Sequence, residues 1–451
     1  FRVESARRCI EAARTVYRLL GVEERIVAVY PPGGHGFPPE ARENAYRFMD
    51  RVLLGKQAEP DTAGASEASS EAVIVDADFP GGNILFDKIE GDTVFLRQDL
   101  RDTAGNWFYW CFRIRGVVGR TLAFRFTDGN VIGVRGPAVS LDGGESWTWL
   151  GAAAVDGASF TYTFPASAGE VRFAFTMPYQ EADLQEFLCR HENHPSLRVE
   201  TLCRTAGGRD TERLRVGRLD GNADHRVLLT ARHHCCETMA SYVMEGVLAT
   251  ILNDEDDGAW LREHVEFLAV PFMDKDGVEA GDQGKNRKPH DHNRDYIQKI
   301  YPSVQALAEC VPTWSDGRLR IALDLHCPWI RGPNNEVIYF VGGPDADIWK
   351  RVSRFAELLE ELRQGPLVYR TADNLPFGKA WNTGMAAPNL KSFGLWAAEL
   401  PGIEVAGTIE TAYANASGSE VNADTARAFG RDLARAIRAY LDRGRRSDSG
   451  G

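Results

Sequence analysis

Hydrophobic and polar positions follow three successive patterns along the chain. The first pattern, over residues 1–56, predicts a helix at 2–20, a short strand at 25–30 and an amphipathic helix at 39–54. Apolar residues of this last helix lie near helical spacing: Ala41, Ala45, Phe48, Met49 and Val52. The next residues, 57–70, are rich in Ala, Ser, Glu and Gly, a composition typical of a linker.

Residues 71–180 show an all-β pattern, within a domain that we expect to span residues 71–188. Apolar and polar residues alternate over 113–126 and 158–164, as in half-buried strands. Turn signals separate the short strands: Pro80-Gly81-Gly82, Asp128-Gly129-Asn130, Asp142-Gly143-Gly144 and Asp156-Gly157. Strands at this spacing predict a small β-sandwich. We expect its tryptophans to be packing residues: Trp107, Trp110, Trp147 and Trp149.

Residues 189–445 alternate strand and helix patterns, which predicts an α/β domain with a mostly central, buried sheet. The expected strands lie at 226–230, 265–272, 319–325, 337–341 and 405–410. The expected helices lie at 237–252, 348–362 and 422–442. This division agrees with the roughly two to four domains expected for a chain of 451 residues.

Composition and charge exclude several classes of protein. The chain is 43% hydrophobic and 26% charged, which is near the average for globular proteins and excludes global disorder. The net charge of -12 argues against a binder of nucleic acid or anionic membranes, since both need a basic face. No apolar run approaches the roughly 20 residues of a membrane span. Eight cysteines are too few for a disulfide scaffold, and the adjacent pair Cys235-Cys236 favours a reducing, cytoplasmic location.

Two predicted strands are followed by residues that can bind a metal. His233-His234-Cys235-Cys236-Glu237 follows the apolar strand and opens a helix, and His326 ends the strand at 319–325. Both lie beyond carboxyl strand ends, where open α/β sheets bind ligands. Alone, the first is also typical of a solvated pair and the second of a hydrogen-bonded imidazole. Together, His-x-x-Glu and His326 offer three zinc ligands and leave the fourth position open, as in catalytic zinc sites.

Two further segments carry polar residues in a suggestive order. One is Pro289-His290-Asp291-His292-Asn293-Arg294. The other is Gly407-Thr408-Ile409-Glu410-Thr411, a strand that ends in an acid. A carboxylate at that position is suited to act as a general base on a metal-bound water.

The order His-x-x-Glu, Asp-x-Asn-Arg, strand-terminal His and strand-terminal Glu resembles the zinc metallocarboxypeptidases, the carboxypeptidase A-like family. The resemblance spans about residues 200–440, and the β-rich block resembles the amino-terminal domain of the cytosolic-type branch. It implies an α/β fold in which helices flank a mixed central sheet. It also implies one zinc ion per chain and hydrolysis of the last peptide bond of a peptide or protein substrate.

The resemblance assigns a role to each matched residue. The zinc ligands are His234, Glu237 and His326. Asp291 is the acid that orients the first His, because a carboxylate on the far ring nitrogen fixes the tautomer and raises basicity. Asn293 and Arg294 bind the terminal carboxylate of the substrate, which suits the fork of an arginine. Glu410 is the general base and acid.

Several positions depart from the family pattern. The segment 284–288 offers three cations for the oxyanion, of which we assign Arg287 and keep Lys285 as the alternative. Asp274-Lys275-Asp276-Gly277 replaces the usual Asn-Pro-Asp-Gly, and His292 takes an apolar position, which indicates a divergent subgroup. His233 is an alternative ligand to His234, and Cys235 and Cys236 are expected to be small buried residues. The mobile phenol of the family has no convincing match in Tyr369 or Tyr413.

Residues 390–400 are expected to contribute to the pocket for the terminal side chain. They are largely apolar, with Phe393, Leu395 and Trp396, which favours an apolar or aromatic side chain. Lys391 and Glu399 offer charged alternatives.

Residues 1–56 resemble the carboxyl-terminal end of an α/β-hydrolase esterase, in which a loop histidine equivalent to His35 is the triad base. No Gly-x-Ser-x-Gly elbow precedes His35, so we expect it to be inert. A simple helical extension with a Gly/Pro turn is the alternative.

Two other functions compete with the carboxypeptidase. One is a zinc amidase that acts on side-chain glutamyl or cell-wall peptide bonds. The other is an inactive peptidase-like binding protein, against which the complete set of ligands and Glu410 argues.

Overall fold

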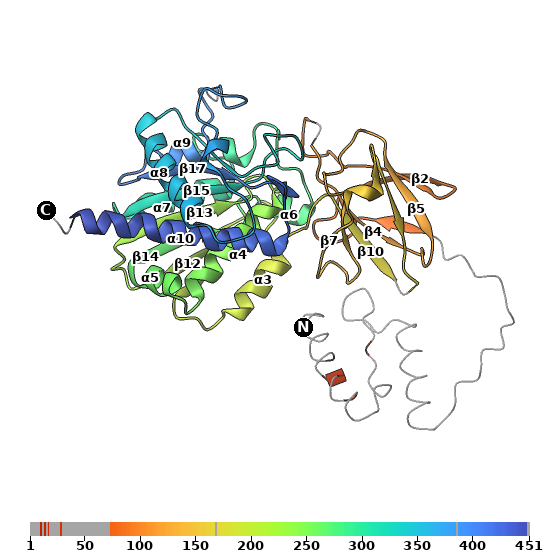
Figure 1. Ribbon diagram of the computed structural model, residues 1–451, viewed down its shortest axis with the longest axis horizontal. Coiled ribbons are helices and arrows are strands. Elements are labelled where there is room, and N and C mark those ends of the chain that lie inside the picture. Colours follow the sequence, from red (N-terminus) through yellow and green to blue (C-terminus); the bar gives the residue numbers. More distant parts are fainter. Residues whose placement is uncertain are drawn as a thin grey trace. The chain divides into compact units, whose positions relative to one another are not determined.

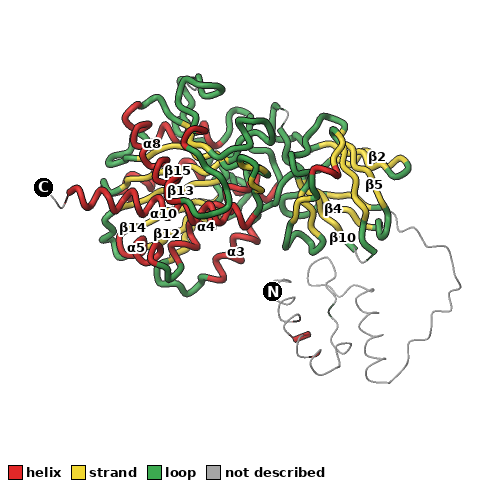
Figure 2. The backbone as a smooth tube through the Cα atoms, in the orientation of Figure 1, coloured by secondary structure: helices red, strands yellow, loops and turns green. Residues whose placement is uncertain are grey.

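The computed structural model describes residues 73–448 except 106, 167–168 and 385–386, together with residues 10, 13, 14, 17 and 28. Residues 71–451 form one compact unit, whose helices, strands and loops are shown in Figures 1 and 2. Apart from those five residues, the predicted N-terminal segment, the linker and His35 lie outside the described residues, and the expectations for them stay predictions.

The β-rich part consists of two five-stranded sheets that face each other. The first has the order β1 (Ile74–Asp76), β4 (Cys111–Arg115), β10 (Glu170–Ala174), β6 (Ala138–Ser140) and β7 (Thr148–Trp149). The second has the order β2 (Leu85–Glu90), β3 (Thr93–Arg97), β5 (Thr121–Phe126), β9 (Ser159–Thr163) and β8 (Val155–Asp156), and a short 3-10 turn, η2 (Ala152–Ala154), precedes β8. Phe173 of the first sheet lies 5.2 Å from both Phe124 and Phe160 of the second, between ring centroids. The predicted β-sandwich is confirmed.

The second part contains a mixed seven-stranded sheet. Its order is β11 (Leu197–Arg204), β12 (Asp210–Gly217), β14 (Val265–Val270), β13 (His225–Ala231), β15 (Leu319–His326), β17 (Val405–Glu410) and β16 (Tyr339–Val341). The strands β14, β13, β15 and β17 are parallel, and antiparallel strands complete both edges. Every residue of β14 is buried, as expected where a sheet is covered on both faces. The predicted mixed central sheet is confirmed.

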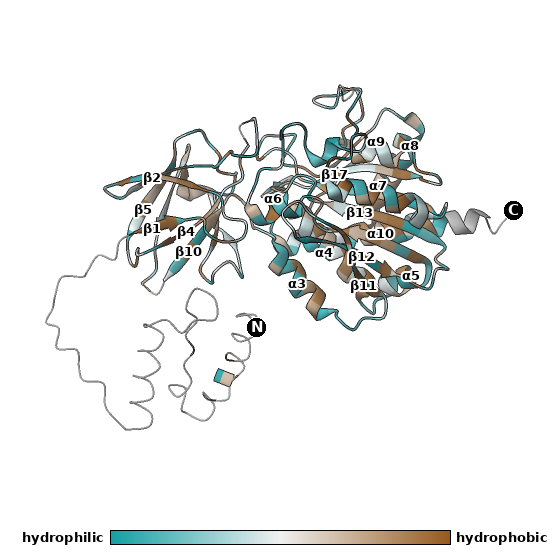
Figure 3. Ribbon diagram, turned by 180° about the vertical axis from the view of Figure 1, so that it is seen from behind, coloured by the Kyte–Doolittle hydropathy of each residue, from teal (hydrophilic) through white to brown (hydrophobic). Residues whose placement is uncertain are grey.

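Helices flank this sheet. They are α3 (Glu181–Arg190), α4 (Thr238–Leu252), α5 (Asp256–His264), α6 (Lys275–Ala280), α7 (Pro302–Ser315), α8 (Ala346–Leu362), α9 (Phe393–Ala397) and α10 (Ala423–Asp448). The shorter elements are η3 (His292–Arg294), η4 (Thr371–Asp373), β18 (Asn415–Ala416) and β19 (Ser419–Glu420). The long α10 carries both hydrophobic and hydrophilic residues and runs beside α4 (Figures 1 and 3). The two helices approach closely because glycine lies at the contact: a Cβ added to Gly430 would lie 2.1 Å from the Val243 carbonyl oxygen.

The sheet topology brings three polar segments to one edge. The strands β13, β15 and β17 are parallel, so their carboxyl ends meet there. The turn that contains His234 follows β13, His326 ends β15 and Glu410 ends β17. His326 and Glu410 are direct partners in the β15–β17 register. Within the described residues, no helix has the length and apolar character needed to cross a bilayer.

Candidate active site

Two imidazoles and a carboxylate converge at the carboxyl edge of the sheet. His234 Nδ1 lies 3.0 Å from Glu237 Oε1, and His326 Nδ1 lies 2.6 Å from Glu237 Oε2. All three residues are buried, and one ligand atom from each lies within 4.8 Å of the others. The structure therefore brings together the three residues expected to bind zinc, although they come from the ends of two separate strands.

A buried arginine holds the turn that carries this cluster. Arg232 has a positive φ of 62°, which is unusual for a residue with a side chain, and it is fully buried. Its guanidinium donates to the carbonyl oxygen of Cys235 at 2.9 Å, the carbonyl oxygen of Tyr179 at 2.9 Å and the hydroxyl of Ser241 at 3.0 Å. These bonds fix the turn between β13 and α4, and Glu237 is the N-cap residue of α4.

The far ring nitrogens of both imidazoles face carboxylates. His234 Nε2 lies 3.5 Å from Asp291 Oδ1, in the direction expected for the orienting acid. His326 Nε2 forms a hydrogen bond with Asp324 Oδ2. Each imidazole thus turns Nδ1 toward Glu237 and the other nitrogen toward an acid. Two such histidines and a carboxylate are a donor set that fits a divalent metal such as zinc.

Asp324 is a site residue that the sequence analysis missed. It is fully buried, and its Oδ1 also accepts hydrogen bonds from Thr230 Oγ1 and forms one with His233 Nδ1, both at 2.8 Å. Burial alone would raise the pKa of Asp324, but His233 and His326 hold it below its ordinary value. The sequence contains a signal for Asp324, because residues two apart in a strand share a face. Asp324 stands two positions before the predicted ligand His326 and therefore faces the same site.

His233, the alternative ligand, is engaged elsewhere. Its Nδ1 meets Asp324, and its Nε2 lies 2.8 Å from the hydroxyl of Tyr296. Burial lowers the pKa of His233, against the opposing effect of Asp324. His233, Asp324 and His326 also form a possible ligand group by distance alone, but the hydrogen bonds of His233 occupy both its nitrogens. The placement favours His234 as the ligand.

A cavity of about 810 Å³ opens beside the cluster. The predicted site residues that line it are His234, Asp291, Asn293, Arg294, His326 and Glu410. Lys285 and Trp107 also line it, and Trp107 comes from the β-rich part. The sequence predicts only a packing role for Trp107, because nothing in the local sequence distinguishes it from the other tryptophans.

Glu410 lies in this cavity without a fixed partner. It is 8% exposed, and within the described residues its Oε2 has no hydrogen-bond partner. Burial raises the pKa of Glu410, and the nearby His326 opposes this effect. A buried carboxylate with a free oxygen and a raised pKa is suited to take up and return a proton.

Asn293 and Arg294 share the short turn η3 on the cavity wall. Asn293 Oδ1 accepts a hydrogen bond from the backbone N–H of Phe393 at 2.9 Å, which fixes the side chain. Arg294 Nη1 donates to the carbonyl oxygen of Asn293 at 2.9 Å. No described residue forms an ion pair with the Arg294 guanidinium, so its remaining donors are available to an anion in the cavity.

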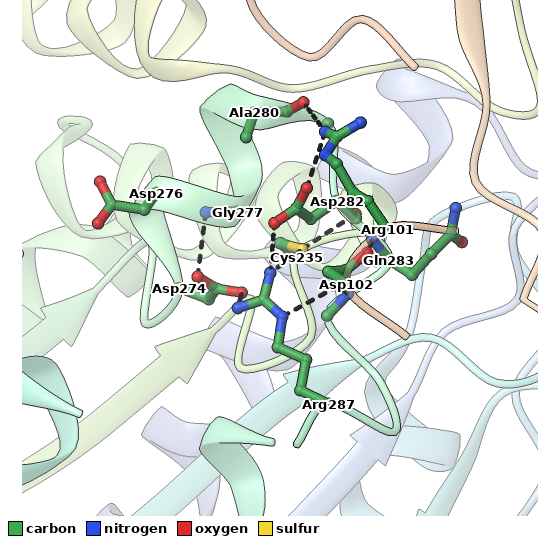
Figure 4. Close-up of polar contacts among 12 residues, drawn as sticks. Arg101, Asp102, Cys235, Asp274, Asp276, Gly277, Ala280, Asp282, Gln283 and Arg287 are labelled. Atoms are coloured by element: carbon green, nitrogen blue, oxygen red, sulfur yellow. Dashed lines mark hydrogen bonds and ion pairs between the residues drawn. The ribbon is translucent and has the colours of Figure 1, made fainter. Parts of the chain in front are cut away.

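Arg287 is placed differently from the role expected of it. Its guanidinium pairs with Asp102 at 2.9 Å, Asp274 at 2.5 Å and Asp282 at 2.8 Å, and it does not line the cavity (Figure 4). Lys285 lines the cavity, and its Nζ lies 2.7 Å from Glu237 Oε1. The placement argues against Arg287 and favours the alternative, Lys285, as the cation of the site.

Five further residues singled out by the sequence lie outside the cavity: Cys235, Cys236, His292, Tyr369 and Tyr413. Cys235 and Cys236 are buried and free, as expected. His292 is buried and stacks on Tyr301, with 3.7 Å between ring centroids. Tyr369 and Tyr413 are buried and do not line the cavity, so neither is placed to act as a mobile phenol.

Comparisons with known proteins agree with this geometry. No protein-family model matches the chain. It is similar to cytosolic carboxypeptidase 3 of Bos taurus, with 32% identity over 157 residues that make up 32% of this chain and 16% of that protein. Among solved structures, it is similar to a metallo-carboxypeptidase from Burkholderia cenocepacia, with a TM-score of 0.67, 20% identity and coverage of 82% of this chain and 99% of that chain. A metallo-carboxypeptidase from Pseudomonas aeruginosa gives a TM-score of 0.65 at 22% identity, with coverage of 82% and 99%.

The predicted family resemblance is confirmed by these findings. The described part of the chain has the metallo-carboxypeptidase fold, and its sequence is related to the cytosolic carboxypeptidases. The matched segment spans only 16% of the length of the curated relative, so the activity of the whole relative is not transferred by similarity alone.

We predict that Asp324→Asn weakens zinc binding about 10- to 100-fold, because His326 loses the charged partner that orients its ring. Competition with a fluorescent zinc chelator measures this affinity. Asp224→Asn is the matched control, since Asp224 Oδ2 pairs with His264 Nδ1 at 2.8 Å near the opposite strand ends. Equal zinc affinities for the Asp324 variant and the unchanged protein would contradict the prediction.

Proposed function

We propose that this chain, a relative of the metallo-carboxypeptidases, removes residues from the carboxyl termini of peptides or proteins in a metal-dependent reaction. One observation carries the proposal: the His234–Glu237–His326 cluster shares a cavity with an acid that has a free oxygen, Glu410, and with an arginine that has free donors, Arg294. The curated relatives are named as cytosolic enzymes, which supports the expected cytoplasmic location.

Zinc is the metal that we propose for His234, Glu237 and His326, because nitrogen and carboxylate ligands with one open position are typical of catalytic zinc sites. When bound there, zinc would supply Lewis-acid polarisation of the scissile carbonyl group and activation of water. Asp324 holds the far nitrogen of His326 by a hydrogen bond, and Asp291 lies 3.5 Å from the far nitrogen of His234, so that both acids favour rings with Nδ1 directed at the ligand position.

Glu410 moves the protons of the reaction. Its carboxylate takes a proton from the attacking water as the new carbon–oxygen bond forms, and it then returns that proton to the leaving amine. The raised pKa of Glu410, which burial causes, suits both steps. The pairing of His326 with Glu410 in adjacent strands keeps the acid beside the proposed metal ligands throughout.

Two cations and an amide bind the substrate. The Arg294 guanidinium and the Asn293 side chain bind the terminal carboxylate of the peptide, which selects exopeptidase over internal cleavage. Lys285 donates to the carbonyl oxygen on which negative charge develops. This assigns the oxyanion role to Lys285 in place of Arg287, whose guanidinium is already paired with three acids.

One part of the cavity wall favours a neutral terminal side chain. It consists of residues without charge: Ile348, Leu395, Ala398 and Gly407. Glu399 also lines the cavity, but its carboxylate pairs with Lys391 Nζ at 2.7 Å, so the two charged candidates of this segment neutralise each other. An apolar or aromatic terminal residue therefore suits this wall better than a charged one.

We predict that the purified chain, loaded with zinc, shortens peptides from their carboxyl ends and that a chelator abolishes this activity. Digestion of a peptide library, analysed by mass spectrometry, tests the activity and reveals the preferred terminal residue. Loss of activity with chelator and its return with zinc is expected. A fully active, metal-free preparation would rule out the proposed mechanism.

A second prediction concerns Glu410. Glu410→Gln should bind zinc normally but lower kcat by about 100- to 10,000-fold, because the amide cannot accept the proton of water. Metal analysis and steady-state kinetics measure the two effects separately. Glu420→Gln is the control, since Glu420 is half-exposed and pairs with Arg135. If the Glu410 variant turns over at the normal rate, another group is the base.

Arg294→Ala should weaken binding of peptides with a free carboxyl terminus and spare those with an amidated one. Loss of a hydrogen bond to a charged group corresponds to about 1.5–3 kcal/mol, or roughly 10- to 150-fold in affinity. Inhibition constants of matched free-acid and amide peptides give the comparison. An equal loss for both peptides would contradict the role of Arg294.

A further inference from the structure

The loop that carries Lys285 is held by the β-rich part of the protein. Backbone and side-chain hydrogen bonds connect the two along the length of the loop. They are Gly81 N–H to the Glu279 carbonyl at 2.9 Å, Asn83 Nδ2 to the Gly281 carbonyl at 2.8 Å, and Ala104 N–H to the Asn286 carbonyl at 3.2 Å. Tyr109 and Gln283 exchange two bonds, at 2.8 and 2.9 Å. The loop therefore takes its shape from residues about 180 positions earlier in the chain.

Asp102, in the β-rich part, binds the same loop through several hydrogen bonds. Its Oδ1 accepts the backbone N–H of Gln283 at 3.0 Å, and its Oδ2 accepts the backbone N–H of Gly284 at 2.8 Å. Its Oδ2 also accepts from Arg287 Nε at 2.9 Å (Figure 4). One carboxylate thus binds three donors of the loop, on both sides of Lys285. Charged acceptors form the stronger class of hydrogen bond, which suits a clamp of this kind.

The loop has no room to shift toward the cluster. Gly284 has a φ of +78°, and a Cβ added to it would lie 2.4 Å from the backbone nitrogen of Cys235. Because Cys235 follows the proposed ligand His234, the loop backbone packs directly against the turn that carries the ligand. Asp102 accepts a hydrogen bond from the backbone N–H of Gly284, the residue that makes this contact.

The β-rich part also contacts the side chain of Lys285. Its Nζ lies 4.7 Å from the ring centroid of Trp107 and 2.7 Å from Glu237 Oε1. Trp107 offers an aromatic face, which attracts a cation, and covers a side chain that is 14% exposed. Asp102 thus fixes the backbone next to Lys285, while Glu237 and Trp107 contact its ammonium group.

We propose that Asp102 is a positioning residue of the active site, which acts through the loop at 282–287 to hold the Lys285 ammonium group at the reacting carbonyl. The inference rests on the proposed function, in which Lys285 stabilises the developing oxyanion. Removal of the Asp102 carboxylate frees two backbone N–H groups beside Lys285. The pairs of Arg287 with Asp274 and Asp282 do not involve Asp102, so we expect them to keep the loop folded in the variant.

Hydrogen–deuterium exchange of the full chain tests the clamp without reference to activity. In Asp102→Ala, the amides of Gln283 and Gly284 should exchange at least tenfold faster, while those of β13 and β15 keep their rates. Asp87→Asn is the matched control, because Asp87 pairs with Arg97 within the β-rich part at 3.0 Å. Unchanged exchange of both loop amides would overturn the proposal. If Asp102→Ala does not fold, Asp102→Asn replaces it, with the same expectation.

Kinetics of a double variant test whether Asp102 acts through Lys285. Asp102→Ala should lower kcat at least tenfold with less than a threefold change in KM, and Lys285→Met should lower kcat by at least as much. The double variant should be no slower than Lys285→Met within twofold, whereas losses that multiply would overturn the proposal. If the unchanged protein cleaves no peptide, the proposed function fails, and the exchange rates alone then decide whether Asp102 holds the loop.

Discussion

The burial of the Glu237 carboxylate is the constraint on which the site depends. A fully buried acid is stable only where positive charge or hydrogen-bond donors surround it. Burial alone would raise the pKa of Glu237, but Lys285 and the imidazoles of His234 and His326 lower it well below its ordinary value. The imidazoles in turn face acids on their far sides. Asp291 lies near His234 Nε2, and Asp324 forms a hydrogen bond with His326 Nε2. Acidic and basic side chains thus alternate in this buried site, and the arrangement fits a divalent cation.

Two structural parts share the construction of this site. The central sheet supplies the cluster and Glu410 from the ends of parallel strands, which are rigid supports for groups that must keep their geometry. The β-rich part supplies Trp107 on the cavity wall and the contacts that shape the loop of Lys285. The β-sandwich therefore contributes to the proposed active site and is more than an appended module.

Much of the fold and of the site could be predicted because the signals are local. The apolar runs at 319–325 and 405–410 fall within β15 and β17, and the strand-terminal positions of His326 and Glu410 follow from them. Several elements escaped prediction. Among them, β11 is an edge strand with charged and exposed residues, and α7 contains Pro312; others are α3, β12, α5, α6 and α9. The choice between Arg287 and Lys285 depends on Asp102, which lies about 180 residues away in the sequence. The local sequence does not indicate which acids pair with which cation. Asp324 was within reach through strand alternation, whereas Trp107 was not.

The side-by-side pairing of His326 with Glu410 has a consequence for how this protein can change over evolution. Side chains in a strand alternate between faces, so one residue inserted or deleted within 405–410 would turn Glu410 away from the ligands and bury a different side chain in its place. Between these two strands the chain runs through β16, α8, η4 and α9, and a change of length in the loops that join them leaves the pairing of His326 with Glu410 intact. Changes of length can therefore arise in that intervening region, while the two strand ends tolerate neither a change of length nor, at His326 and Glu410, a change of residue.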